Sequence, residues 1–102
     1  MREFVYALSD SRRRAPAYVG RTRDITKRYK EHSAGTVKQT SKWIAELRRL
    51  GGDLRMTVLE LVRAESASHR EMQWIVTLDT PLNKNGQGYN LLPNIPRSPS
   101  DD

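Results

Sequence analysis

The residues best suited to chemistry lie in one short stretch, from Tyr18 to His32, with the sequence YVGRTRDITKRYKEH. Its first residues favour a β-strand that ends in glycine, and Thr22 or Asp24 can cap the helix that follows. Residues at three- and four-residue spacing share one helix face, so Arg28 and His32 lie together on it. A buried arginine requires a phosphate or carboxylate partner. The pattern therefore places an arginine and a histidine where an anion can bind.

A carboxylate lies on the apolar face of a later predicted helix. That face consists of Ala67, Glu71, Trp74, Ile75 and Leu78. Because an unpaired buried charge is costly, Glu71 needs a cation. The spacing alone leaves two alternatives open, a metal ion or a salt bridge to Arg28 or Arg70.

These residues together resemble the signature of the GIY-YIG nucleases. Phe4-Val5-Tyr6 stands twelve positions before Tyr18 and corresponds to the first motif, with Phe4 where the family usually has glycine. The sequence TPLN supplies an asparagine directly after a proline and a leucine. In family order the matching residues are Tyr6, Tyr18, Arg28, His32, Glu71 and Asn83, a set that spans about the whole globular chain.

The resemblance implies a DNA endonuclease that hydrolyses phosphodiester bonds with a divalent cation. Glu71 would bind a single Mg²⁺, for which Mn²⁺ can substitute, because hard cations prefer carboxylate and water oxygens. Arg28 would give a forked hydrogen bond to the scissile phosphate. Asn83 would hold the site by hydrogen bonding.

The resemblance also implies that tyrosine takes part in activating the attacking water. Tyr6 is the leading candidate for the general base, with Tyr18 orienting the water or sharing the phosphate. Since a free tyrosine has a pKa near 10, it needs nearby cations or a second proton acceptor. His32 can be that acceptor. The sequence leaves open which of the three is the base.

The remaining pattern predicts the elements that position these residues. Residues 2–8, a short run beginning at Tyr18, and residues 54–62 are predicted as strands. The helices are expected after Thr22 or Asp24, after a Ser41 cap, and from Ser66 or Ser68. This order, β-β-α-α-β-α, predicts an α+β fold with a small three-stranded antiparallel sheet flanked by helices. We expect one domain over residues 1–92, loop-like from Asp79 onward, and a flexible tail over residues 93–102.

Composition favours a polyanionic partner. The 102 residues carry a formal net charge of +6 with a sequence pI of about 10.1, and they include no cysteine. No apolar run is long enough to span a bilayer, and no signal peptide is evident, so no membrane partner is expected. The candidate DNA-binding residues, for which a solvated surface is the alternative interpretation, are Arg12, Arg13, Arg14, Arg21, Arg23, Lys38 and Lys42.

Two functions follow from these expectations. The first is a Mg²⁺-dependent DNA endonuclease that nicks DNA or cuts both strands. The second is a catalytically inactive or partner-dependent nucleic-acid-binding module on the same scaffold. We also expect a cytoplasmic protein of bacterial, phage or mobile-element origin, with a homodimer or a partner subunit supplying specificity.

Overall fold

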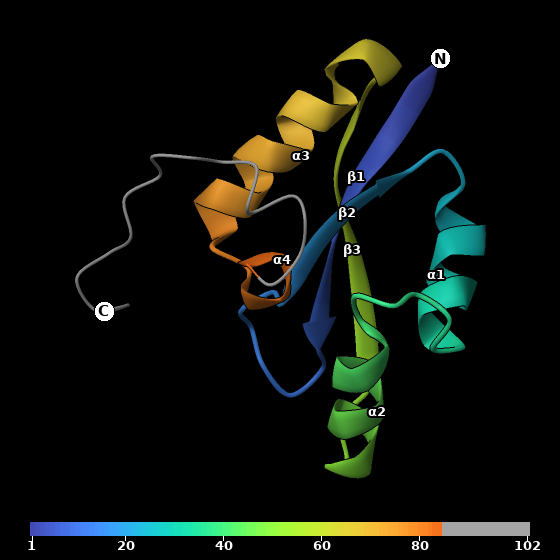
Figure 1. Ribbon diagram of the computed structural model, residues 1–102, viewed down its shortest axis with the longest axis vertical. Coiled ribbons are helices and arrows are strands. Elements are labelled where there is room, and N and C mark those ends of the chain that lie inside the picture. The colour runs from blue at the N-terminus through green and yellow to red at the C-terminus, as the bar shows by residue number, and fades with distance from the viewer. Residues whose placement is uncertain (85–102) are drawn as a thin grey trace.

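A three-stranded antiparallel sheet lies at the centre of the computed structural model, which describes residues 1–84 (Figure 1). Its strands are β1 (Arg2–Asp10), β2 (Tyr18–Thr22) and β3 (Leu54–Arg63), in the spatial order β2-β1-β3. The helices are α1 (Ile25–Ser33), α2 (Ser41–Arg49), α3 (Ala64–Leu78) and the short α4 (Pro81–Lys84). The predicted α+β class and antiparallel sheet are confirmed.

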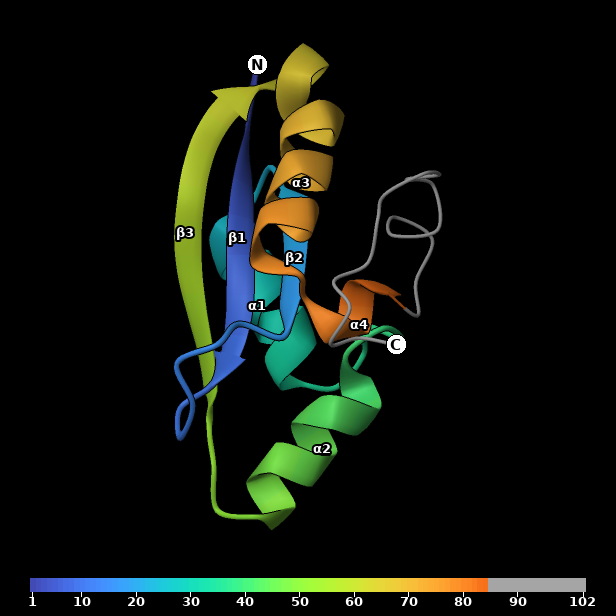
Figure 2. The same cartoon turned by 90° about the vertical axis from the view of Figure 1, so that its left-hand side faces the viewer.

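The central strand β1 is apolar on both sides because both faces of the sheet are covered. Val5 and Ala7 belong to a core that includes Ile75 of α3. Tyr6 and Leu8 belong to a second core that includes Ile44 of α2. Figure 2 shows α3 in front of the sheet and α1 behind it. The sheet therefore separates the two groups of candidate site residues.

Local capping explains how α1 is placed beside β2. The side chain of Asp24 accepts a hydrogen bond from the backbone N–H of Lys27 at 3.0 Å, which confirms one of the two predicted caps. Gly35 has a φ of +78° just after the helix, a backbone conformation that glycine adopts without steric cost. The helix is thus limited to the two turns that carry Arg28 and His32.

The start of α3 differs from its prediction. The helix begins at Ala64, directly after β3, and neither Ser66 nor Ser68 caps it. The N–H of Ala64 instead donates to the carbonyl of Met1 at 2.9 Å, so backbone pairing replaces a side-chain cap. Ser41 likewise is the first residue of α2, and Thr40 occupies the cap position.

The segment after Asp79 was predicted as loop, but Pro81–Lys84 forms the short helix α4. The predicted domain end at residue 92 and the tail over residues 93–102 lie outside the described residues. In residues 1–84, no helix is both long enough and apolar enough to cross a membrane.

Candidate active site

A buried chain of hydrogen bonds joins β1, α1 and the start of α2. The Tyr6 hydroxyl lies 2.8 Å from Nε2 of His32, and Nδ1 of His32 lies 2.7 Å from Oγ1 of Thr40. All three side chains are at most 1% exposed. Tyr6 and His32 were predicted as site residues, and the structure brings them into direct contact.

The partners of these side chains are compatible with one arrangement of the protons. The Thr40 hydroxyl can donate to the carbonyl of Val37, at 3.4 Å, while it accepts from Nδ1–H of His32. Nε2 is then the unprotonated nitrogen, and the Tyr6 hydroxyl donates to it. Burial, with the nearby positive charge of Arg28, lowers the pKa of His32 to about 4. The histidine is therefore neutral at neutral pH and able to accept a proton.

Gly20 leaves the space that the Tyr6 ring occupies. Tyr6 and Gly20 are paired in the β1–β2 register. A Cβ atom on Gly20 would lie 2.6 Å from Cζ of Tyr6 and closer still to its hydroxyl oxygen. Only glycine at this position lets the tyrosine hydroxyl cross β2 and reach His32.

Tyr18 completes an aromatic cluster at the edge of the sheet. Its ring centroid lies 6.4 Å from that of Tyr6 and 5.6 Å from that of His32. Burial, with the negative charge of Glu71, raises the pKa of Tyr18 above its ordinary value. Burial likewise raises the pKa of Tyr6, with Tyr18 adding to the effect. Both phenols are therefore protonated at neutral pH.

Arg28 lies beside this cluster with one side-chain nitrogen unpaired. Its Nη1 contacts Oε1 of Glu31 at 3.0 Å, and its guanidinium is close enough to the Tyr6 hydroxyl to interact with it. The Nε atom of Arg28 is buried and has no hydrogen-bond partner among residues 1–84. The other buried side-chain nitrogens and oxygens in this part of the chain do have one. A buried N–H without an acceptor is costly, so this group favours an incoming anion.

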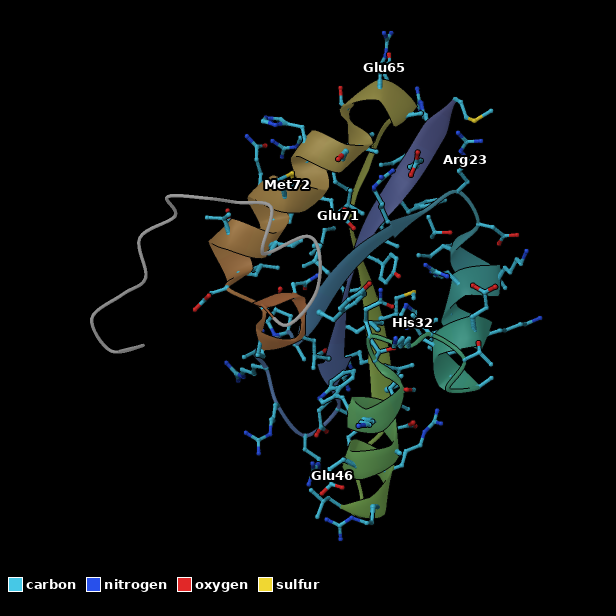
Figure 3. The ribbon with its side chains drawn as sticks, viewed as in Figure 1. Arg23, His32, Glu46, Glu65, Glu71 and Met72 are labelled. Atoms are coloured by element: carbon cyan, nitrogen blue, oxygen red, sulfur yellow. The ribbon has the colours of Figure 1, made fainter. Side chains whose placement is uncertain are left out.

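Glu71 approaches from the opposite face of the sheet. It projects from α3 toward the sheet, whereas His32 lies on the α1 side (Figure 3). Its Oε1 lies 3.4 Å from Nε of Arg21, and its side chain is 23% exposed. Burial raises the pKa of this carboxyl group, while the charge of Arg21 opposes the rise.

The salt-bridge partner of Glu71 differs from both of its predicted partners. Arg70 instead contacts Glu60 at 2.9 Å, and Arg28 contacts Glu31. The interpretation of Glu71 as an ion-paired residue is therefore correct in kind, with a different arginine. Arg21 was predicted only as a DNA contact, and the structure pairs it with both Glu71 and Glu3.

Asn83 holds the edge strand β2 in place. Its side chain accepts from the N–H of Val19 at 2.8 Å and donates to the carbonyl of the same residue at 3.0 Å. The Thr80 hydroxyl donates to Oδ1 of Asn83 at 2.6 Å. These bonds fix the backbone next to Tyr18, and the role of Asn83 in supporting a catalytic site stays a prediction.

The predicted DNA-binding residues are not all free to bind DNA. Arg12 contacts Asp10 at 2.6 Å and the carbonyl of Leu50 at 3.1 Å, and its hydrogen bonds lower the pKa of Asp10 to about 2. Arg12 therefore closes the β1–β2 loop against the end of α2. Arg21 and Arg23 both contact Glu3, at 3.1 and 3.9 Å. The remaining predicted residues, Arg13, Arg14, Lys38 and Lys42, are exposed.

Two residues of this region were missed by the sequence interpretation. Thr40 fixes the His32 ring, and nothing in its local sequence distinguishes it from an ordinary helix cap. Glu3 is only 8% exposed and holds Arg21. The signal for Glu3 was available, since it alternates with the buried Val5 and Ala7 on one side of β1.

A divalent cation would depend on Glu71 with few other protein ligands. In residues 1–84, no three His, Cys, Asp or Glu side chains gather into a metal-binding group. Mg²⁺ commonly keeps several waters and uses only one or two carboxylates together with substrate phosphate. A single half-buried carboxylate such as that of Glu71 fits that pattern.

Comparison with known proteins agrees with this geometry. Neither curated proteins nor solved structures gave a match to the chain. The family model described as the GIY-YIG catalytic domain matches residues 2–90. That span includes each of the candidate residues from Tyr6 to Asn83. The chain therefore belongs to the GIY-YIG family of endonucleases.

Proposed function

We propose that this protein is a Mg²⁺-dependent endonuclease that hydrolyses phosphodiester bonds in DNA. GIY-YIG nucleases generally use divalent metal ions. The observation that carries the proposal is the hydrogen bond from the Tyr6 hydroxyl to a neutral His32, next to the unpartnered Nε of Arg28. This arrangement combines a proton acceptor with an anion-binding group.

Arg28 binds the scissile phosphate in this proposal. Its partly exposed guanidinium has a buried Nε–H without an acceptor, so a phosphate oxygen would satisfy it. A planar guanidinium donates two parallel hydrogen bonds to phosphate, which lysine cannot reproduce. The fixed positive charge stabilises the transition state, where negative charge on the phosphoryl oxygens is largest.

The attacking water loses its proton through Tyr6. Because the Tyr6 hydroxyl is buried in the free protein, this step requires that DNA binding bring a water into contact with it. The phenol oxygen then accepts the water proton while the phenol proton passes to Nε2 of His32, 2.8 Å away. A stable phenolate is not required, which matters because burial raises the pKa of Tyr6. A phosphate bound to Arg28 would offset the positive charge that helps lower the pKa of His32, making the histidine a better acceptor.

Glu71 is the residue that would hold the metal ion, and Tyr18 would orient the water or the phosphate. When bound, the cation supplies Lewis-acid stabilisation of a phosphate oxygen and the leaving 3′ oxygen. Glu71 reaches the aromatic cluster closely enough to raise the pKa of Tyr18. In this arrangement, Arg28 and Tyr6 on one face of the sheet and Glu71 on the other would act on the same phosphate.

A second function is favoured by the Arg21–Glu71 ion pair. In a nucleic-acid-binding module without catalysis, Glu71 would be a structural partner of Arg21 rather than a metal ligand. Such a module would bind DNA through its net positive charge, and binding would weaken steeply with added salt. The two functions differ in whether removing Glu71 affects bond cleavage.

Nicking of a supercoiled plasmid distinguishes them. We expect open-circular or linear product with Mg²⁺ and none with EDTA. Glu71→Gln should lose cleavage, whereas Glu65→Gln, an exposed acid on the same helix, should keep it. Salt-sensitive DNA binding without cleavage in any condition would support the binding module. Wild-type cleavage by purified Glu71→Gln would exclude Glu71 from the site.

A further inference from the structure

Arg21 joins two carboxylates that come from different elements. Nη1 of Arg21 lies 3.1 Å from Oε1 of Glu3, on β1. Nε of the same guanidinium lies 3.4 Å from Oε1 of Glu71, on α3. One arginine on β2 therefore occupies the carboxylate that, in the proposed function, binds the metal ion.

Glu3 fixes the position of the Arg21 guanidinium. The acid is only 8% exposed and pairs with Arg21 and, at 3.9 Å, with Arg23. A carboxylate with so little solvent contact stabilises a cation beside it more strongly than an exposed one does. Glu3 thus holds Arg21 close to Glu71 while no other ligand is present.

The arginine is nevertheless able to leave. Its side chain is 38% exposed, and its ion pair with Glu71 is longer than its pair with Glu3. Because two positive charges at one carboxylate repel each other, the Arg21 guanidinium opposes the binding of a divalent cation to Glu71. Cation binding is therefore favoured when the Arg21 Nε–H moves away from Oε1.

We propose that Arg21, anchored by Glu3, is a positioning residue that competes with the divalent cation for Glu71. This inference rests on the proposed function of Glu71. When the cation binds, the displaced guanidinium is available to a DNA phosphate, so cation and DNA binding favour each other. By reciprocity, DNA that draws Arg21 away strengthens cation binding by the same factor.

The first test measures Mn²⁺ binding to DNA-free protein, by the loss of free-ion electron paramagnetic resonance signal. The variant is Glu3→Gln with Arg21→Gln, which leaves the net charge unchanged and avoids an unpaired buried acid. The matched control is Glu3→Gln with Arg23→Gln, which makes the same charge change but keeps Arg21. We expect the first double variant to bind Mn²⁺ about tenfold more tightly than the control, a typical coupling between sites. Equal affinities would overturn the proposal.

A second measurement uses the wild-type chain and does not depend on the variants folding. The Nε–H signals of the arginines are followed by NMR during a Mg²⁺ titration. Arg21 should shift, whereas Arg12, bound to Asp10, and Arg70, bound to Glu60, should not. An Arg21 signal that stays unchanged while Mg²⁺ shifts the signals around Glu71 would also overturn the proposal.

These outcomes separate the proposal from the proposed function. Competition between Arg21 and Mn²⁺ without any DNA cleavage would support the competition and contradict the nuclease. Glu71-dependent cleavage with no effect of Arg21 on Mn²⁺ affinity would support the nuclease and contradict the competition.

Discussion

The two faces of the sheet hold their parts of the site by different interactions. On the α1 and α2 face, Tyr6, His32 and Thr40 are buried and joined by neutral hydrogen bonds of 2.7 and 2.8 Å. On the α3 face, Glu71 is partly exposed and held by an ion pair of 3.4 Å. The first set is fixed by burial, and the second can exchange its partner for a ligand.

This difference matches the tasks we propose for the two faces. A proton relay needs constant distances, since transfer depends on hydrogen-bond geometry. A metal ligand instead has to release one cation and accept another. Gly20 lies on the edge strand β2 and Arg28 on α1, so substitutions at these positions and at His32 sharpen the comparison.

The largest effect is expected from Arg28→Ala. Removing the group that stabilises charge on the phosphate should slow plasmid nicking about 10²–10³-fold with little change in folding. Arg28→Lys should remain far below the wild-type rate because lysine lacks the planar fork. Lys27→Ala, on an exposed neighbour in the same helix, is the control. Wild-type nicking by Arg28→Ala would remove this residue from the site.

Lowering the pH should reduce the free energy of unfolding, because His32 is buried in its neutral form. Because burial lowers its pKa in the folded chain to about 4, folding favours the neutral form. Its contribution to stability is therefore complete above the ordinary pKa of about 6.5 and falls as pH decreases toward 4, by up to roughly 3 kcal/mol. Urea unfolding of wild type and His32→Gln at pH 4 to 7 measures this. Parallel pH dependence in both proteins would contradict the assignment.

A smaller effect is expected from Gly20→Ala. The added methyl group overlaps the Tyr6 ring, so we expect a loss of about 1–3 kcal/mol in the free energy of unfolding. Adding Tyr6→Phe removes the hydroxyl that lies closest to the new Cβ and should recover part of that loss. Urea titrations of the two single variants and the double variant form the cycle. Strictly additive losses would mean that the two residues do not share this space.

Most of the fold was predictable because its signals are local. Alternation marked β1, helical spacing marked α1 and α3, and the Asp24 cap and Gly35 bounded α1. The start of α3 was not predictable from its serines, since the N–H of Ala64 is satisfied by the carbonyl of Met1, the first residue of the chain. Backbone pairing between residues far apart in the sequence cannot be inferred from local secondary-structure propensities.

The site residues differ in the same way, because local sequence marks some of them and only long-range contacts identify the others. The spacing of Arg28 and His32 placed them on one helix face, and the family signature added Tyr6, Tyr18, Glu71 and Asn83. The contacts of Glu71 were not predictable, because its partner Arg21 comes from β2 and is held by Glu3 of β1. Thr40 was missed because its role depends on how α2 packs against α1.

The central claim is that both faces act on one phosphate, and the most direct test compares plasmid nicking rates of Tyr6→Phe, Glu71→Gln and the double variant. Residues that act as one unit are not additive, so we expect each single change to slow nicking about a hundredfold or more and the double variant to be no slower than the slower single variant. A double variant whose loss equals the product of the two single losses, or wild-type nicking by either single variant, would contradict a shared site.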